Sequence, residues 1–379
     1  MKRLISLLFL AVGLTAAAQN SPKYEQFKTY RDEADTLRMK QMLDSWGEED
    51  AEYYAAWTNY CWVMAEETMD EDWIPLGLNW IQMGRDQFPD NHLLILKQGE
   101  VLFNADCYQE ALPVLLEADE KGIADVATWF YLASIYSLKN DRESARPYLD
   151  KMIQNGDDED REYAQELLQY YDEVDHTIDS LLLRPDHEAI RKFAETADFQ
   201  ALVSRFEACD TTLTREEIST LYYGSAYVND YNMVSMTCSG IRDIVDEGRI
   251  QEAVDSLQVL LKDYPVSMYI LISIFNLSED EAVYEPCAWK VRNLLTAIDF
   301  SGTGISPESP LQVICVNDEY SFLSQVYDME ELKSQELLDD LPLGPQDRMN
   351  LLNSYGLDQV AYFYLAPPYW ERLNALTEE

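Results

Sequence analysis

From Trp129 to Leu149 the chain reads WFYLASIYSLKNDRESARPYL, and this stretch decides the fold of its first half. Asp141 is a residue type that often caps the start of a helix. Ala145 and Leu149 follow it four positions apart, a spacing that places both on one face of a helix. The same Ala-x-x-x-Leu spacing occurs 34 residues earlier, at Ala111. A period of 34 residues indicates stacked repeats of two helices each.

The order of large and small residues in this stretch resembles that of the tetratricopeptide repeat. The resemblance implies three helical hairpins: a degenerate one from Ala51, a second over about 92–125 and a third over about 126–156. A further helix over about 161–182 then caps the array. Small residues recur where the two helices of a hairpin cross, because they let the backbones approach. Such repeats bind other molecules and carry out no chemistry of their own.

By the same resemblance, the first helix of each hairpin lines a concave surface for a protein or peptide partner. The candidate groove residues of the second and third hairpins are Leu96, Glu100, Phe103, Asn104, Phe130, Ser134 and Ser137. Three hairpins suffice for a short groove, but they could equally serve to brace a second domain. The sequence leaves both roles open.

The N-terminus predicts export. Lys2 and Arg3 precede an apolar run of 11 residues, Leu4–Leu14, which is too short to span a bilayer as a helix. Three alanines ending at Ala18 give the small-residue pattern that a signal peptidase recognises. We therefore expect residues 1–18 to be a signal peptide, no transmembrane segment, and a mature protein that is periplasmic or secreted.

The composition limits the classes of partner and ligand that we expect. A formal net charge of −42 repels phosphate backbones and attracts cations and basic proteins, so we expect no nucleic-acid partner. The 6 cysteines permit disulfides in an exported chain, but they are scattered, with neither CxxC nor zinc spacing. We expect mostly buried thiols, with one disulfide as the alternative, and no metal or cofactor.

Beyond Pro185 the 34-residue register is lost. We therefore place the helical-repeat domain over residues 19–183 and a second domain over residues 184–379. Thr214-x-x-Glu217 and Ser278-x-x-Glu281 have the spacing of a capping box, in which a hydroxyl and a carboxyl satisfy the first backbone N–H groups of a helix. Each predicts a helix start.

Near residue 300 the periodicity changes from helical to alternating. Residues 311–316, LQVICV, predict a strand, and Leu351–Leu352 with residues 360–365 predict a β-hairpin that turns at Gly356. The expected fold class is therefore mostly α: a helical-hairpin array followed by an α+β domain with helical hairpins and a small antiparallel sheet.

Five short motifs follow one another in the second domain: Asp210-Thr211-Thr212-Leu213-Thr214, Leu221-Tyr222-Tyr223-Gly224, Ser301-Gly302-Thr303-Gly304, Asp318-Glu319-Tyr320 and Tyr362-Phe363. Together, and in this order, they resemble a domain of unknown function found in exported proteins of gut bacteria, sometimes behind tetratricopeptide repeats. The resemblance implies a fold and an exported location. It implies no activity.

Asp318, Glu319 and Tyr320 are the candidate loop site of this domain. They could supply an acid, a base and a phenol directly after a strand, a place where functional side chains are common. The alternative is a plain helix N-terminus, where acidic side chains interact favourably with the helix dipole.

Three further patterns have a functional and a structural interpretation. Residues 301–304 could bind an anion through backbone N–H groups, but a tight turn explains the glycines more simply. Residues 157–160 could bind calcium weakly, although they lack the alternation of a calcium loop. The early tryptophans could capture a glycan if exposed, but their helical spacing favours core packing. These tryptophans are Trp46, Trp57, Trp62, Trp73 and Trp80.

Two functions from different classes follow. The leading hypothesis is a non-catalytic protein-binding or scaffolding protein of the bacterial cell envelope. The alternative is a hydrolase, or a glycan-processing or glycan-binding protein, with its site near Asp318, Glu319 and Tyr320. The alternative requires a concave pocket that opens onto these side chains.

Overall fold

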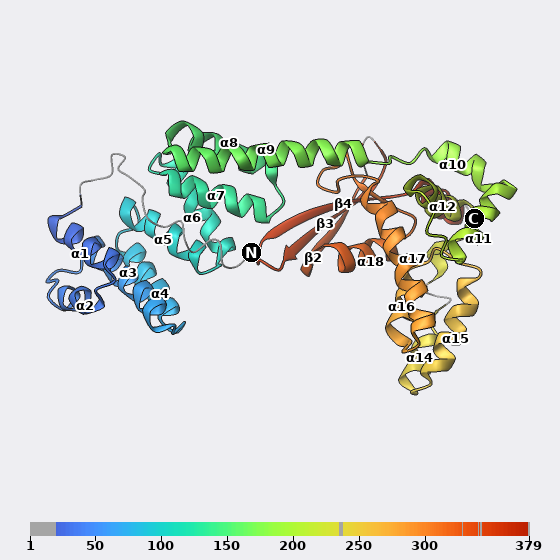
Figure 1. The fold of residues 1–379 in the computed structure, drawn as a ribbon, viewed down its shortest axis with the longest axis horizontal. Helices are drawn as coiled ribbons and strands as arrows, with labels where there is room; N and C mark the ends of the chain where they lie inside the picture. The colour runs from blue at the N-terminus through green and yellow to red at the C-terminus, as the bar shows by residue number, and fades with distance from the viewer. Residues whose placement is uncertain (1–19, 235–237, 328, 340, 342, 378–379) are drawn as a thin grey trace. The chain divides into compact units, whose positions relative to one another are not determined.

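The computed structural model describes residues 20–234, 238–327, 329–339, 341 and 343–377 (Figure 1). The expected signal peptide lies outside the described residues. The fold is mostly helical, with an N-terminal array of helix pairs and a four-stranded sheet in the C-terminal region. The chain divides into two compact units, residues 1–173 with 355–357 (unit 1) and residues 174–354 with 358–379 (unit 2).

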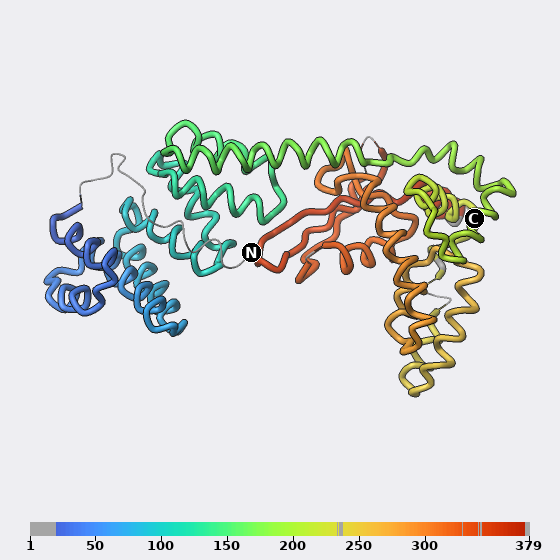
Figure 2. The backbone as a smooth tube through the Cα atoms, in the orientation of Figure 1, coloured from blue at the N-terminus to red at the C-terminus, as the bar shows by residue number. Residues whose placement is uncertain are grey.

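Unit 1 is built from consecutive helices that pack in pairs (Figure 2). The pairs α3–α4, α5–α6 and α7–α8 coincide with the three expected hairpins, and α9 is the expected capping helix. The helices are α1 (Pro22–Asp32), α2 (Thr36–Asp44), α3 (Ala51–Thr68), α4 (Trp73–Gln87), α5 (His92–Asn104), α6 (Tyr108–Glu120), α7 (Val126–Leu138), α8 (Arg142–Asn155) and α9 (Asp158–Leu181), the last of which ends in unit 2.

Local chemistry explains where these helices begin and how closely they pack. Asp141 caps α8, its carboxylate accepting from the backbone N–H of Ser144 at 3.0 Å. Ala111 and Ala145, the residues that carry the 34-residue period, are both fully buried. Small residues therefore stand at the helix crossings, as the sequence predicts.

Gly84 tests how tightly one such crossing is packed. A Cβ atom there would lie 2.7 Å from Cβ of Tyr54, a fully buried side chain on the facing helix. We expect Gly84→Ala to force α3 and α4 apart and lower the free energy of unfolding by about 1–3 kcal/mol. Hydrogen-exchange mass spectrometry should show faster exchange in peptides from α3 and α4.

The matched control is Asn79→Ala, an exposed position on the same helix. Because Ala favours a helix and the hydrogen bond of this side chain is an exposed one, from its Nδ2 to Sδ of Met83 at 3.8 Å, its effect should stay within about 0.5 kcal/mol. Equal exchange in the two variants would contradict a tight crossing at Gly84.

Unit 2 combines its sheet with helices, most of them short. They are α10 (His187–Ala194), α11 (Ala197–Glu207), α12 (Arg215–Val228), the 3-10 turn η2 (Tyr231–Met233), α14 (Ile241–Asp246), α15 (Ile250–Leu261), α16 (Met268–Leu277), α17 (Glu281–Asp299), α18 (Val316–Val326) and α19 (Pro367–Thr377). The capping box at Thr214 is confirmed, with the Thr214 and Glu217 side chains each bonded to the other's backbone. The start expected at Ser278 is wrong by two residues, because Asp280 caps α17 instead.

The sheet has the order β1-β4-β3-β2. Its strands are β1 (Leu311–Val313), β2 (Met329–Leu338), β3 (Gln346–Asn353) and β4 (Asp358–Leu365). The expected hairpin is present as the antiparallel pair β3–β4. The sheet is mixed rather than antiparallel, since β1 runs parallel to β4. The strand expected over 311–316 stops at Val313, because α18 already begins at Val316.

Successive side chains of β3 lie on alternate faces of the sheet. Asp347, Met349 and Leu351 all point to the buried side of the sheet, while the residues between them are partly exposed. Helix α18 packs on this side, with the Phe322 ring 6.2 Å from the ring of Phe363 on β4. A carboxyl group on β3 is therefore directed toward a helix that carries two more.

Candidate functional site

The second-hairpin groove residues lie on α5 with different degrees of exposure. Leu96, Glu100 and Asn104 are partly exposed, and Glu100 forms an ion pair with Lys97, whose Nζ lies 2.5 Å from its carboxylate. Phe103 is 6% exposed and packs 4.5 Å from the Tyr131 ring, in a cluster that also buries Leu357. On α5, the three partly exposed residues are the ones that a partner could contact.

The third-hairpin groove residues on α7 are covered by α9. The Phe130 ring lies 5.5 Å from that of Tyr163, and Ser134 is hydrogen-bonded to the same tyrosine. Ser137 shares a short hydrogen bond with the Tyr171 hydroxyl. These three side chains therefore hold the capping helix in place, a use that the repeat pattern did not predict.

The early tryptophans lie in and around a buried cluster of unit 1. The rings of Trp57 and Trp80 stack with centroids 4.9 Å apart, and Trp46 is 7% exposed. Glycan capture needs open ring faces, so the core-packing interpretation holds for Trp46, Trp57 and Trp80. Trp62 and Trp73 are partly exposed at the edge of the cluster.

Asp318 is buried in unit 2 and held by a tyrosine from a distant part of the chain. The Tyr222 hydroxyl on α12 donates to Asp318 at 2.6 Å, and the same oxygen accepts from the backbone N–H of Ile314 at 3.3 Å. Asp318 is only 2% exposed, and burial raises its pKa to about 7, even though hydrogen bonds from Tyr222 and Cys315 lower it. The carboxyl therefore keeps its proton to a higher pH than an exposed aspartate does.

Glu319 is the least compensated group of the site. It is fully buried, and neither carboxyl oxygen has a donor among the described residues. The carboxyl group within hydrogen-bonding reach is that of Asp347 on β3, itself 7% exposed. Burial and the neighbouring Asp347 charge raise the pKa of Glu319 well above its usual range, and burial raises the pKa of Asp347. Two carboxyls this close in a buried place cannot readily both be charged, so their proximity favours the protonated form of Glu319.

Tyr320, the third member of the motif, points the other way. Its side chain is 42% exposed, and its hydroxyl donates to Gln335 on β2 at 2.6 Å. Two clefts described in unit 2 are lined by residues of α10, α11, α12 and α19, and neither borders Asp318 or Glu319. The motif thus places two carboxyls in the core and a phenol at the surface, with no described cleft joining them.

The other sequence candidates have structural roles. The Gly304 N–H donates to the Ser309 carbonyl oxygen at 2.8 Å, and the Thr303 N–H donates to the Ser309 hydroxyl at 3.0 Å. Both amides are therefore used within a tight turn. Asp157 accepts from the N–H groups of Glu159 and Asp160 at the start of α9. Among the described residues, no cluster of His, Cys, Asp and Glu could hold a metal.

All six cysteines are free thiols, so the alternative of one disulfide is wrong. In the described part of the chain, no helix is long and apolar enough to cross a membrane.

Sequence reasoning missed two members of the buried acidic group, Tyr222 and Asp347. Tyr222 stands in the Leu221–Gly224 motif, where nothing local distinguishes it from Tyr223. Asp347 had a usable signal, because it falls two positions before Met349 in an alternating strand and so shares its buried face.

The C-terminal region matches a known family. Residues 186–359 match the model described as Domain of unknown function (DUF4919). The chain therefore carries a C-terminal DUF4919 domain preceded by paired helical hairpins, which confirms the expected domain of unknown function. No curated protein matches the sequence.

The hydrogen bond between Tyr222 and Asp318 leads to a testable prediction about stability. Tyr222→Phe leaves the buried Asp318 without its strongest donor, so we expect a loss of about 2 kcal/mol in the free energy of unfolding and a higher pKa for Asp318. Urea unfolding at pH 7 measures the first. The exposed Tyr320→Phe is the control, and a shift of equal size there would show that the buried bond has no special weight.

Protonation of Glu319 and its neighbours makes stability depend on pH. The folded-state pKa values of Asp318, Glu319 and Asp347 lie above those of the unfolded chain. The folded state therefore keeps protons that the unfolded state releases, so this part of the stability is present at acid pH and lost as pH rises from about 4 through about 7. Each pKa unit corresponds to about 1.4 kcal/mol.

Glu319→Gln tests this linkage. The variant has no charge to bury, so between pH 5 and 8 we expect it to lose less stability than the natural chain, by about 2 kcal/mol or more, in paired urea titrations. Glu330→Gln, on the exposed part of β2, should follow the natural chain. Parallel curves for all three proteins would mean that Glu319 does not titrate across this range.

Proposed function

We propose that the protein is a non-catalytic binding or scaffolding protein of the bacterial cell envelope. In this proposal the chain is exported after cleavage near Ala18, and the helix pairs of unit 1 are tetratricopeptide repeats that hold a protein or peptide partner. The observation that carries the proposal is the partly exposed surface of α5 at Leu96, Glu100 and Asn104. Helix surfaces of this kind are the recognition elements of repeat proteins.

The chemistry of unit 2 supports binding over hydrolysis. A general acid or base must come within hydrogen-bond reach of its substrate. Asp318 and Glu319 have raised pKa values, as catalytic carboxyls often do, but both are sealed among core side chains. Burial, with the neighbouring Asp347 charge in the case of Glu319, accounts for both shifts, so the raised pKa values require no catalytic role.

Photo-cross-linking in the cells that produce the protein tests the proposal. A photoreactive amino acid at Leu96 or Asn104 should capture a reproducible protein partner, identified by mass spectrometry. The same group at Glu110, exposed on α6, is the control and should not capture it. The intact mass of the recovered chain also shows whether residues 1–18 have been removed.

Two outcomes would count against the proposal. Capture of the same proteins from Leu96 and Glu110 would indicate non-specific contact with the surface. Recovery of an uncleaved chain from the cytoplasm would remove the cell envelope from the proposal.

A further inference from the structure

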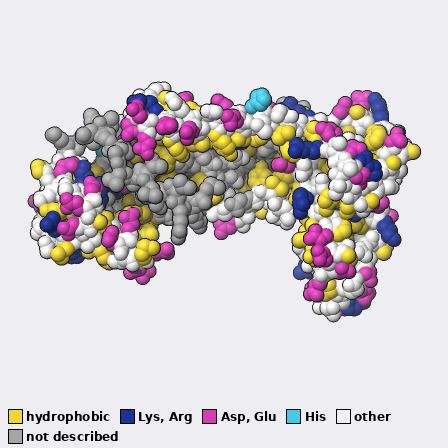
Figure 3. Space-filling model, in the orientation of Figure 1, with side chains coloured by type: hydrophobic (Ala, Val, Ile, Leu, Met, Phe, Trp, Pro, Cys, Tyr) yellow, Lys and Arg dark blue, Asp and Glu magenta, His cyan; other side chains and the backbone are white. Residues whose placement is uncertain are grey.

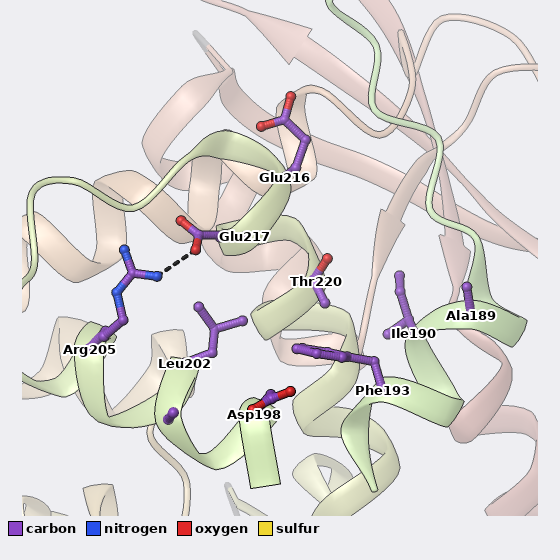
Figure 4. Close-up of a pocket in the computed structure, with 10 residues that line it drawn as sticks. Ala189, Ile190, Phe193, Asp198, Leu202, Arg205, Glu216, Glu217 and Thr220 are labelled. Atoms are coloured by element: carbon purple, nitrogen blue, oxygen red, sulfur yellow. Dashed lines mark hydrogen bonds and ion pairs between the residues drawn. The ribbon is translucent and has the colours of Figure 1, made fainter. Parts of the chain in front are cut away.

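A cleft of about 510 Å³ opens between α10, α11 and α12 (Figure 4). Its apolar wall includes Ile190, Phe193 and Leu202, and the Phe193 and Leu202 side chains point toward the same space. Ala201 on α11 lines it and is exposed. A volume of this size accommodates one or two large side chains, within the range of specific ligand pockets.

The one basic side chain that lines this cleft is already occupied. Arg205 donates through Nε to Asp210 at 2.7 Å and also bonds Glu217 and Thr212. The second carboxyl oxygen of Glu217 accepts from the N–H of Thr214 at 2.8 Å. The Arg205–Glu217 pair drawn in Figure 4 thus belongs to a group in which one guanidinium serves two carboxylates, and it leaves no positive charge for an incoming ligand.

Two other acidic side chains line the cleft. Asp198 on α11 and Glu216 on α12 are exposed, and neither forms an ion pair with another described residue. Acidic side chains are scattered over the face drawn in Figure 3, so negative charge alone distinguishes no site. The distinguishing feature is an apolar hollow flanked on two helices by carboxylates without an ion-pair partner among the described residues; that of Glu216 also accepts a hydrogen bond from the Thr214 side chain.

We propose that this cleft binds a basic segment of a partner protein. A large apolar side chain of the segment rests on Phe193 and Leu202, and Lys or Arg residues on either side of it face Asp198 and Glu216. This rests on the proposed function and adds the chemistry of the partner. The two carboxylates come from different helices, so the ligand must carry charge on both sides of its apolar group. A peptide chain does this, and a single-headed amphiphile does not.

The test uses the full chain and a fluorescein-labelled amphipathic peptide of leucine and lysine, followed by fluorescence anisotropy at low salt. We expect saturable binding, and none for the matched peptide of leucine and glutamate. Asp198→Asn with Glu216→Gln should weaken binding about 3- to 10-fold, and added salt should reduce that difference. Ala201→Trp should weaken it more than about 10-fold, because the indole fills the hollow.

The control has the same change in charge away from the cleft. Asp243→Asn with Glu279→Gln, both exposed in unit 2, should change affinity less than about twofold. Equal weakening by the two double variants, or unchanged binding to Ala201→Trp, would overturn the proposal. Displacement of the peptide by dodecylammonium at comparable concentration would reassign the cleft to a small amphiphile.

These outcomes are separable from those for the proposed function. A partner captured from Leu96, with no peptide bound at the cleft, would leave the binding role standing and remove only the cleft. Absence of any captured partner would remove the role itself.

Discussion

The hydrogen bond from Tyr222 to Asp318 is the constraint on which the arrangement of unit 2 depends. It joins α12 to the first turn of α18, and the same phenolic oxygen accepts from Ile314 just after β1. A carboxyl that is 2% exposed needs a donor, because an unpaired buried polar group costs several kcal/mol. Helix α12, strand β1 and helix α18 must therefore take their places together. The face of the sheet that carries Asp347 then meets Glu319.

Sequence periodicity predicted the parts of the fold that are determined locally. The helix pairs of unit 1 follow from spacing within each hairpin and from small residues at the crossings. Strand β2, MEELKSQELL, was missed because it has no β-branched or aromatic residue and reads as a polar helix. It is a strand because β3 supplies a partner along its length, from Met329 to Leu338, and tertiary pairing outweighs local propensity.

For the candidate site, too, the sequence predicted what is local and missed what depends on tertiary packing. Asp318, Glu319 and Tyr320 could be recognised as neighbours, but whether each side chain is buried depends on packing against α12 and β3. Asp347 becomes a neighbour of Glu319 only through the sheet. The groove residues on α7 could not be distinguished from those on α5, because the helix that covers α7 lies outside the repeat.

In unit 2 the carboxyls with raised pKa values are buried, whereas the cleft lies at the surface. Groups with perturbed protonation are inside, where they make the core sensitive to pH, and the surface carries an apolar hollow flanked by acidic side chains. Chemistry at a buried acid needs access, whereas recognition needs only shape and charge at the surface. The distribution of these groups therefore agrees with the binding function that we propose.

The free thiols give this chain an internal measure of local opening. A thiol reagent attacks the thiolate, and burial raises the pKa of Cys61 to about 11 and that of Cys315 well above its usual range. Cys61 lies on α3 and Cys315 directly before α18, so each reacts only when its own surroundings open. Pulsed labelling of the two cysteines would report the dynamics of each unit separately in the intact protein, without an introduced probe.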